Sequence, residues 1–347
     1  MKKSSKESFE LSRYIHTFMD DYAPSQRTTS TNTLKSYYIA ITLYIEFLEK
    51  AEGVTDKTFC SACFEQPVIE RWLNWLKEVR GCSPETCNVR LSSLRVFLNY
   101  LSSRDIKYIY LSNGADMIKA RKTLKKHVTG MSRKAVKTIT EEPDVFTRTG
   151  KRDVTFMIIL YATAARMDEM LDMKISQLHL DDETPYVTII GKGRKIRNIY
   201  LLPKAVAHLK SYLEVFHGAS PNDDDYVFYS RNKGKQGKLS QTAIDKMLKK
   251  HAMSAHNKCP EVPMKVHAHQ FRHAKASHWL EDGMNIAQIS FLLGHADIKT
   301  TMVYLDITLE AELKAMATLE DELDHNIKKK WRNNDGTLKS FCGLSKN

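Results

Sequence analysis

Apolar side chains recur every three or four positions through most of the first hundred residues. This spacing predicts amphipathic helices over residues 8–22, 31–51, 67–80 and 84–103, because one face of a helix repeats at the same interval. Helices of this kind bury their apolar faces against one another. We therefore expect a compact N-terminal helical bundle over residues 8–115.

The pattern becomes mixed between residues 140 and 326. Residues 154–161 are nearly all apolar, as in a buried helix, whereas residues 186–190 and 196–201 are β-rich runs joined by a Gly-bearing turn. Further helices are predicted over residues 201–215, 240–251, 270–281, 286–293 and 298–304. Gly294 is expected to cap the C-terminus of one of them. The predicted fold class is therefore mainly α with a small β-sheet, in which a mixed α/β domain follows the bundle.

Charge indicates a polyanionic partner. Lys and Arg number 53 against 41 Asp and Glu, a net charge of +12, which suits a protein that follows a phosphate backbone, although a ribosomal or membrane-surface protein would carry the same balance. Residues 119–137 contain no acidic side chain, which predicts a basic linker over residues 116–139. Residues 327–347 are expected to form a polar tail. No apolar run is long enough to span a bilayer, so we expect a soluble, cytoplasmic protein.

The most specific chemistry lies between residues 269 and 304. His269 and Arg272-His273 are followed by Gly294-His295 and then by Tyr304. A single His or Tyr in a helical protein means little, because most are packing residues with satisfied hydrogen bonds. Together, Arg and His side chains that donate to an anion and a phenol that can attack form a set suited to phosphoryl transfer.

Two elements nearer the N-terminus extend this set. Arg166 follows the buried apolar run and has Glu169 three residues later, at a spacing where the carboxylate can hold the guanidinium. Lys192 lies in the turn between the two predicted strands, flanked by Gly191 and Gly193. Both positions are therefore candidates for the same phosphate-binding site.

In this order and at these intervals, the residues resemble the active site of the tyrosine recombinase (phage integrase) family. The matching positions are Arg166, Lys192, His269, Arg272, His295 and Tyr304. The motifs cover roughly the second half of the chain, and the bundle is similar in kind to the family's SAM-like core-binding domain. There are departures, since Ala164 stands where the family usually has Gly, Phe271 where it has Leu, and Asp306 where many members have His.

The resemblance implies the role of each residue. Tyr304 attacks a DNA phosphodiester to give a 3′-phosphotyrosine, Lys192 protonates the departing 5′ oxygen, His269 assists as acid and base, and His295 donates to a non-bridging oxygen. The two arginines bind the phosphate, and Glu169 and His273 support the site. DNA-backbone contacts are expected from basic side chains of the bundle and the linker: Lys35, Arg90, Arg95, Arg121, Lys122, Lys125, Lys126, Arg133 and Lys134.

The implied function is that of a site-specific DNA recombinase or integrase that serves integration and excision of a mobile element. It needs no cofactor, because the phosphotyrosine retains the energy of the broken bond. The partner implied is double-stranded DNA with inverted-repeat core sites, bound by a homotetramer that is monomeric when free. A stripe of apolar residues follows the nucleophile: Leu309, Leu313, Met316, Leu319 and Leu323. Such a stripe commonly packs on its own domain, but the resemblance favours docking on a neighbouring protomer.

Two alternatives of another class remain. A type IB topoisomerase-like nicking and closing enzyme would use the same chemistry without strand exchange, and the C-terminal stripe argues against it. A catalytically silent DNA-binding protein would keep the fold, and the presence of every reacting residue argues against silence.

Two sets of residues are candidate metal ligands. Cys60-Ser-Ala-Cys63 with Cys82 and Cys87 could be four zinc ligands, but the wider second pair favours reduced, buried thiols. The histidines at positions 267, 269 and 273 have no carboxylate or Cys at ligand spacing. We therefore expect no metal.

Overall fold

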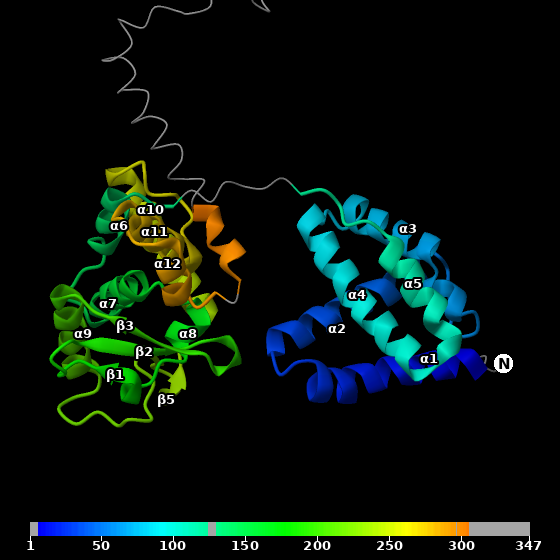
Figure 1. Ribbon diagram of the computed structural model, residues 1–347, viewed down its shortest axis with the longest axis horizontal. Coiled ribbons are helices and arrows are strands. Elements are labelled where there is room, and N and C mark those ends of the chain that lie inside the picture. The colour runs from blue at the N-terminus through cyan, green and yellow to red at the C-terminus, as the bar shows by residue number, and fades with distance from the viewer. Residues whose placement is uncertain (1–5, 124–129, 296, 305–347) are drawn as a thin grey trace, which may run out of the picture. The chain divides into compact units, whose positions relative to one another are not determined.

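The computed structural model describes residues 6–123, 130–295 and 297–304, which belong to two compact units divided between Lys126 and His127 (Figure 1). The division falls inside the stretch predicted to be a linker. Within the described residues, none of the helices combines the length and the apolar character that crossing a membrane requires.

The first unit is helical throughout. Its elements are α1 (Lys6–Thr17), a π-helical continuation (Phe18–Arg27), α2 (Thr31–Lys50), a 3-10 turn (Ser61–Phe64), α3 (Gln66–Glu78), α4 (Pro84–Arg104), a 3-10 turn (Ile106–Tyr108) and α5 (Ile109–Met117). The predicted helices are confirmed, and α5 was not predicted. Helix α4 begins as the sequence suggests, because Pro84 occupies its first turn and the Ser83 side chain accepts a hydrogen bond from the Thr86 backbone.

Aromatic side chains fill the centre of this unit. Tyr44 and Trp72 are fully buried and meet edge to face, with ring centroids 4.9 Å apart. The Tyr44 hydroxyl donates to the backbone oxygen of Cys63 at 2.6 Å, so its polar end is satisfied inside the core. Burial of these rings holds α2 and α3 together.

The second unit combines helices with small antiparallel sheets. Its helices are α6 (Arg133–Thr140), α7 (Arg148–Thr163), α8 (Met167–Leu171), α9 (Pro203–Phe216), α10 (Gln241–Lys258), α11 (Ala268–Glu281) and α12 (Ile286–Leu293). Its strands are β1 (Leu178–His179), β2 (Tyr186–Ile190), β3 (Ile196–Tyr200), β4 (Tyr229–Ser230) and β5 (Gly234–Lys238). Short 3-10 turns cover Ile175–Gln177, Lys192–Arg194, Ile298–Thr300 and Met302–Tyr304.

The fold class is confirmed, with differences in two places. Helix α6 occupies part of the predicted linker, because its apolar side chains Ala135, Val136 and Ile139 are buried in the second unit. The helix predicted over residues 298–304 is instead a pair of 3-10 turns.

The three-stranded sheet has the order β1-β2-β3, and β2 and β3 form the predicted hairpin, in which Ile189 lies opposite Arg197. Val187 and Ile189 of β2 and Ile199 of β3 are buried in the core that also contains Phe156 and Leu160 of α7. Arg197 is on the same inward face of β3 and is only 5% exposed. A charged side chain therefore replaces an apolar one in the buried register of this strand.

Candidate active site

Arg166 is presented at a sharp break between two helices. Helix α7 ends at Ala164, whose backbone is left-handed with φ 48° and ψ 28°, and Arg166 then caps α8. The Arg166 backbone N–H donates to Glu169 Oε2 at 2.8 Å, and its Nη1 donates to Glu169 Oε1 at 2.9 Å. Its Nη2 donates to the backbone oxygen of Gly294 at 3.1 Å. Helix α8 thus fixes the guanidinium against the loop that follows α12.

Glu169 is buried between two arginines. Arg197 Nη2 donates to Glu169 Oε2 at 2.6 Å, its Nη1 to Oε1 at 3.3 Å, and its Nε to the backbone oxygen of Leu292 at 2.8 Å. Burial alone would raise the pKa of Glu169, but the hydrogen bonds and charges of Arg197 and Arg166 outweigh burial and lower it. The carboxylate is therefore ionised at neutral pH and is the anchor of both guanidinium groups.

Arg272 lies on α11 and is almost completely buried, with 1% exposure. Its Nη1 donates to the backbone oxygen of Ala164 at 2.7 Å, and its Nη2 donates to that of Leu293 at 2.6 Å. Burial, followed by the charge of Arg166, lowers the pKa of Arg272 to about 10, so the group stays protonated at neutral pH. The left-handed end of α7 and the end of α12 both contribute carbonyls that position this guanidinium.

Two histidines lie one turn apart on the same helix. The rings of His269 and His273 meet edge to face, with centroids 4.6 Å apart. Desolvation and the charges of Arg272 and Arg166 lower the pKa of His269. Burial, followed by electrostatic coupling to His269 and by the charge of Arg272, lowers the pKa of His273 to about 4. His273 is consequently a neutral imidazole at neutral pH.

His295 follows the end of α12. Gly294 ends that helix in a left-handed conformation, φ 63°, as predicted for a C-terminal cap. The His295 Nδ1 atom lies 2.7 Å from the hydroxyl of Thr301, which orients the ring. Burial and the charges of Arg272 and Arg166 lower the pKa of His295 to about 4. These electrostatic couplings place His295 among the arginines.

Tyr304 is in the last described turn and is 2% exposed. Its ring packs in a small apolar cluster with Ala164, Ile289 and Leu293. The hydroxyl lies 2.6 Å from His273 Nδ1. Burial raises the pKa of Tyr304, and the charge of Arg272 partly opposes that rise. The imidazole in contact with the phenol is thus that of His273.

The backbone at Lys192 forms a tight turn between β2 and β3. The Gly191 N–H donates to the Lys195 oxygen at 2.8 Å, and Gly193 is left-handed with φ 74°. The Lys192 side chain lies outside the described residues. A Cβ added at Gly191 would lie 3.0 Å from Glu169 Oε1 and 3.3 Å from Arg197 Nη1, so the backbone that precedes Lys192 passes close to this buried pair.

The structure brings Arg166, His269, Arg272 and His295 into mutual electrostatic contact and places His273 against Tyr304. Sequence reasoning missed Arg197. A signal for it exists, because the alternation of β3 places Arg197 on the same face as Ile199. Thr301, fully buried beside His295, was also not assigned a role.

The basic side chains expected to touch DNA divide into several groups. In the first unit, Lys35 and Lys122 are exposed. Arg90 and Arg95, also expected to contact DNA, are both half-buried. Arg95 donates to the backbone oxygens of Ala115 and Ile118 and thereby caps α5. Its guanidinium is occupied in holding α4 to α5.

The remaining expected DNA contacts belong to the predicted linker. Arg121 is half-buried and donates to Asn74 Oδ1 at 2.8 Å. Lys125 and Lys126 lie outside the described residues. Arg133 is in ion pairs with Glu281 and Asp282, at 3.4 and 2.8 Å. Lys134 is exposed and lies 3.5 Å from Glu261. Of these, Lys122 and Lys134 have the accessible ammonium groups that a phosphate backbone requires.

The candidate metal ligands among the described residues are not clustered in space. In the described part of the chain, no group of three or more His, Cys, Asp or Glu side chains is arranged to hold a metal ion. Cys60, Cys63, Cys82 and Cys87 are free thiols.

Comparison with known proteins is consistent across sequence and fold. The model of the phage integrase family matches residues 129–310, and that of the phage integrase N-terminal SAM-like domain matches residues 18–108. The chain is 31% identical over 289 residues to tyrosine recombinase XerD of Listeria monocytogenes serotype 4b (strain F2365), a match covering 82% of this chain and 90% of that protein. It is 25% identical over 308 residues to the putative integrase/recombinase y4rC of Sinorhizobium fredii, covering 88% and 91%.

Solved structures share the fold at lower sequence identity. The XerH site-specific recombinase bound to its difH substrate, in a pre-cleavage complex, superimposes with a TM-score of 0.65 and 19% identity, covering 87% of this chain and 94% of that chain. The Tn1549 transposon integrase in complex with a circular intermediate DNA gives a TM-score of 0.64 and 14% identity, covering 90% and 100%.

Proposed function

Since the chain belongs to the phage integrase family of tyrosine recombinases and is a site-specific DNA recombinase, we propose that Tyr304 is its nucleophile. The assigned catalytic set is Arg166, Lys192, His269, Arg272, His295 and Tyr304, with Glu169 and His273 in support. The observation that carries this assignment is the convergence of Arg166 and Arg272 on the backbone just before His295, where their Nη2 atoms donate to the oxygens of Gly294 and Leu293 at 3.1 and 2.6 Å. Burial, together with the charges of these arginines, lowers the pKa of His295 to about 4. Such a cluster is the electrostatic complement of a phosphodiester and of the more negative transition state.

The reaction then follows from the contacts. The Tyr304 oxygen attacks the phosphorus, and its proton passes to His273, whose Nδ1 is 2.6 Å away. Arg166 and Arg272 bind the non-bridging oxygens, for which their planar forks are suited. The 5′ oxygen leaves with its bonding electron pair and takes a proton from Lys192. A 5′ hydroxyl of another strand reverses these steps and reseals the DNA.

His273 has a physical advantage as the first proton acceptor. A neutral imidazole with a free lone pair is required, and burial, assisted by the charge of Arg272, keeps His273 neutral at physiological pH. When a phosphodiester enters the cluster, its negative charge raises the basicity of His273 at the moment when the proton must be accepted. His269 contacts the His273 ring edge to face, and its electrostatic coupling helps to lower the pKa of His273.

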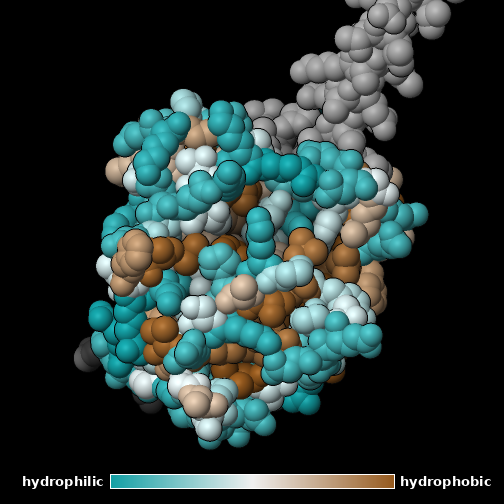
Figure 2. Space-filling view, turned by 90° about the vertical axis from the view of Figure 1, so that its left-hand side faces the viewer, coloured by the Kyte–Doolittle hydropathy of each residue, from teal (hydrophilic) through white to brown (hydrophobic). Residues whose placement is uncertain are grey.

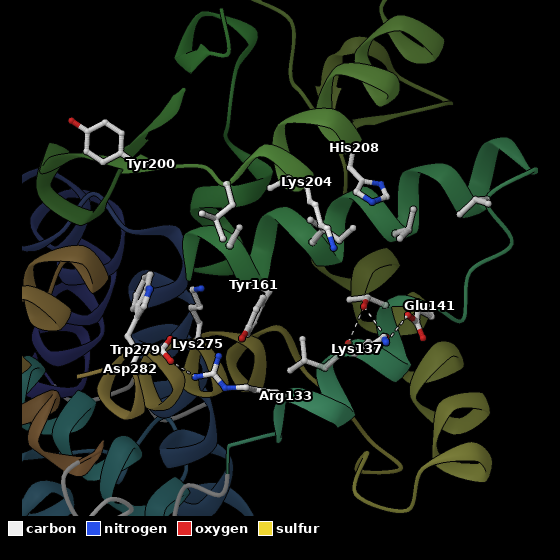
Figure 3. Close-up of a pocket in the computed structure, with 18 residues that line it drawn as sticks. Arg133, Lys137, Glu141, Tyr161, Tyr200, Lys204, His208, Lys275, Trp279 and Asp282 are labelled. Carbon is white, nitrogen blue, oxygen red and sulfur yellow. Dashed lines mark hydrogen bonds and ion pairs between the residues drawn. The ribbon is translucent and has the colours of Figure 1, made fainter. Parts of the chain in front are cut away.

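Assembly on DNA is proposed from a groove on the second unit. The groove has a volume of ≈ 860 Å³ and lies among α6, α7, α9 and α11 (Figure 3). The face of this unit in Figure 2 exposes apolar side chains among polar ones. In the groove, the Lys275 ammonium lies over the rings of Tyr161 and Trp279, at 4.9 and 5.2 Å from their centroids. Lys137 and Lys204 also line it.

The groove suits the segment that follows the nucleophile. Residues 306–325 combine the apolar stripe beginning at Leu309 with many Asp and Glu side chains, and the groove combines apolar walls with the ammonium groups of Lys137, Lys204 and Lys275. We therefore assign the groove as the receptor for this segment of a neighbouring protomer. Exchange around a ring would build a homotetramer on inverted-repeat core sites from free monomers. We place the activity in integration and excision of a mobile element.

The assignment of the nucleophile is tested with a nicked suicide substrate that traps the covalent adduct. Tyr304→Phe should bind half-site DNA as tightly as the wild type and form no adduct, because the ring still packs in its apolar cluster but the attacking oxygen is absent. Tyr226→Phe, in the same unit, is the matched control and should form adduct normally. Recovery of adduct from Tyr304→Phe at the wild-type level would disprove the assignment. Sequencing the joints made in cells separates excised circles from resolved replicon dimers.

A further inference from the structure

Arg197 occupies a position where the strand pattern calls for an apolar side chain. It is 5% exposed, lies opposite Ile189 and faces the same core as Ile199. A guanidinium in such a place is costly unless every donor is matched. Because it is buried on the inner side of the hairpin, Arg197 is not placed to bind DNA, and its role must lie in what it holds.

The contacts of Arg197 converge on the catalytic elements. Glu169 receives two hydrogen bonds from Arg197 and two from Arg166, so that one carboxylate accepts four N–H groups. The remaining edge of the Arg197 guanidinium donates from Nε to the Leu292 oxygen, three residues before His295. A single planar group therefore links β3 with α8 and with the end of α12.

Two glycines allow the backbone to approach this group. A Cβ at Gly191 would lie 3.0 Å from Glu169 Oε1 and 3.3 Å from Arg197 Nη1. A Cβ at Gly294 would lie 3.0 Å from Arg197 Nη1. Gly191 immediately precedes Lys192, and Gly294 immediately precedes His295. The Arg197 and Glu169 pair thus packs against the backbone from which both of these catalytic side chains begin.

We propose that Arg197 is a positioning residue that sets Lys192 and His295 relative to Arg166 through its bidentate pair with Glu169. This inference rests on the proposed roles of those residues. It assigns to Arg197 a separate role, which is to fix their positions. Arg197 acts through geometry, because its fork satisfies both carboxylate oxygens and the Leu292 carbonyl at once. A lysine at the same place keeps the charge but can reproduce only part of this arrangement.

The experiment measures cleavage by full-length protein on two half-site substrates. One has the ordinary 5′ bridging oxygen, and the other has a 5′ bridging sulfur, which leaves without needing a proton. Arg197→Lys should bind both substrates with the wild-type affinity. It should cleave the oxygen substrate about 10- to 100-fold more slowly, the size of effect expected for a misplacement near 1 Å, and the sulfur substrate should restore most of the rate.

Two matched variants separate positioning from a loss of stability. Arg152→Lys alters another arginine of the same unit that pairs with a buried carboxylate, that of Asp153; it should cleave both substrates at equal rates relative to the wild type. Gly191→Ala presses a methyl group on the Arg197 pair without removing a charge, and its φ of −93° accepts Ala. It should reproduce the selective defect of Arg197→Lys even if that variant folds poorly.

The outcomes are distinguishable. Lys192→Ala, measured alongside, reports whether Lys192 is the proton donor. If sulfur rescues Lys192→Ala but both Arg197→Lys and Gly191→Ala keep the wild-type rate or are slowed equally on the two substrates, the positioning role is refuted and the proposed function stands. If sulfur does not rescue Lys192→Ala, the assigned proton donor is wrong and the positioning role falls with it.

Discussion

Acid should destabilise this protein through two active-site histidines before any DNA is bound. His273 and His295 have pKa values lowered to about 4 by burial and by neighbouring positive charges. In the unfolded chain they titrate near 6.5. Between pH 4 and pH 6.5, the unfolded chain binds protons at these two histidines that the folded chain does not bind. These histidines therefore leave the free energy of unfolding unchanged above pH 6.5 and lower it as the pH drops below 6.5, and this loss reaches its full size near pH 4.

The size of the loss follows from the shift. A difference of about 2.5 pKa units corresponds to about 3 kcal/mol for each histidine. Both side chains are partly exposed, and solvent screening reduces this by about half. Together, His273 and His295 should then cost roughly 2 kcal/mol at pH 5 relative to pH 7.5, and roughly 3 kcal/mol near pH 4. A duplex half-site should shrink the loss, because the scissile phosphate offsets the positive charge around both rings.

Urea unfolding at pH 7.5 and pH 5 measures this loss. The double variant His273→Asn, His295→Asn should lose about 2 kcal/mol less than the wild type over that interval, since an amide does not titrate. His208→Asn, on the exposed side of α9, is the control and should behave as the wild type does. An equal acid loss in the wild type and the double variant would refute the reasoning. So would equal protection by an ordinary half-site and by one with an uncharged methylphosphonate at the scissile position.

Further predictions concern the proton donor, assembly and the backbone. Lys192→Ala should slow cleavage by about a hundredfold or more, with rescue by a 5′ bridging sulfur; equal defects on both substrates would point to Lys195 instead. Deletion of residues 308–347 should leave binding to one half-site intact and abolish cooperative binding to paired half-sites in gel shifts, and Trp279→Glu, which puts a negative charge in the groove, should do the same; unchanged cooperativity in both would refute exchange. Ala164→Gly should change the free energy of unfolding by less than about 1 kcal/mol, because relief of the left-handed strain is offset by backbone entropy and a lost buried methyl, whereas Ala164→Val should cost at least about 3 kcal/mol; a harmless Val would contradict the left-handed assignment.

The helices of the first unit were predictable where one face alone is apolar. Helix α5 was missed because its apolar side chains lie on opposite sides, with Leu111 buried and Ile109 and Met117 exposed. Helix α6 was missed for a different reason. Its basic residues dominated the composition, although Ser132 caps its N-terminus and Ala135, Val136 and Ile139 form a buried face.

The sequence indicated which side chains of the site to consider, but it could not give their contacts. Arg272 is held by the backbone oxygens of Ala164 and Leu293, and backbone acceptors leave no trace in a side-chain pattern. The contact between His273 and Tyr304 depends on how α11 and the final turn pack. The importance of Arg197 could have been inferred, because a charged residue in the buried register of a strand requires a buried partner.

The use of carbonyls in place of carboxylates has an electrostatic consequence for the site. Arg272 is fixed by two neutral backbone oxygens, and Arg166 shares the single carboxylate of Glu169 with Arg197. Within the described residues, the hydrogen bonds of Arg272 therefore fix its position without neutralising its charge. Its two carbonyl bonds use two of five N–H groups, so donors remain for a phosphate. The positive charge left over adds to burial in lowering the pKa of His273 and His295. The arginine charges thus add to burial in making the free protein sensitive to acid, and they also attract a phosphodiester. A variant with a carboxylate placed beside Arg272 would therefore be less sensitive to acid and would bind the phosphodiester less tightly.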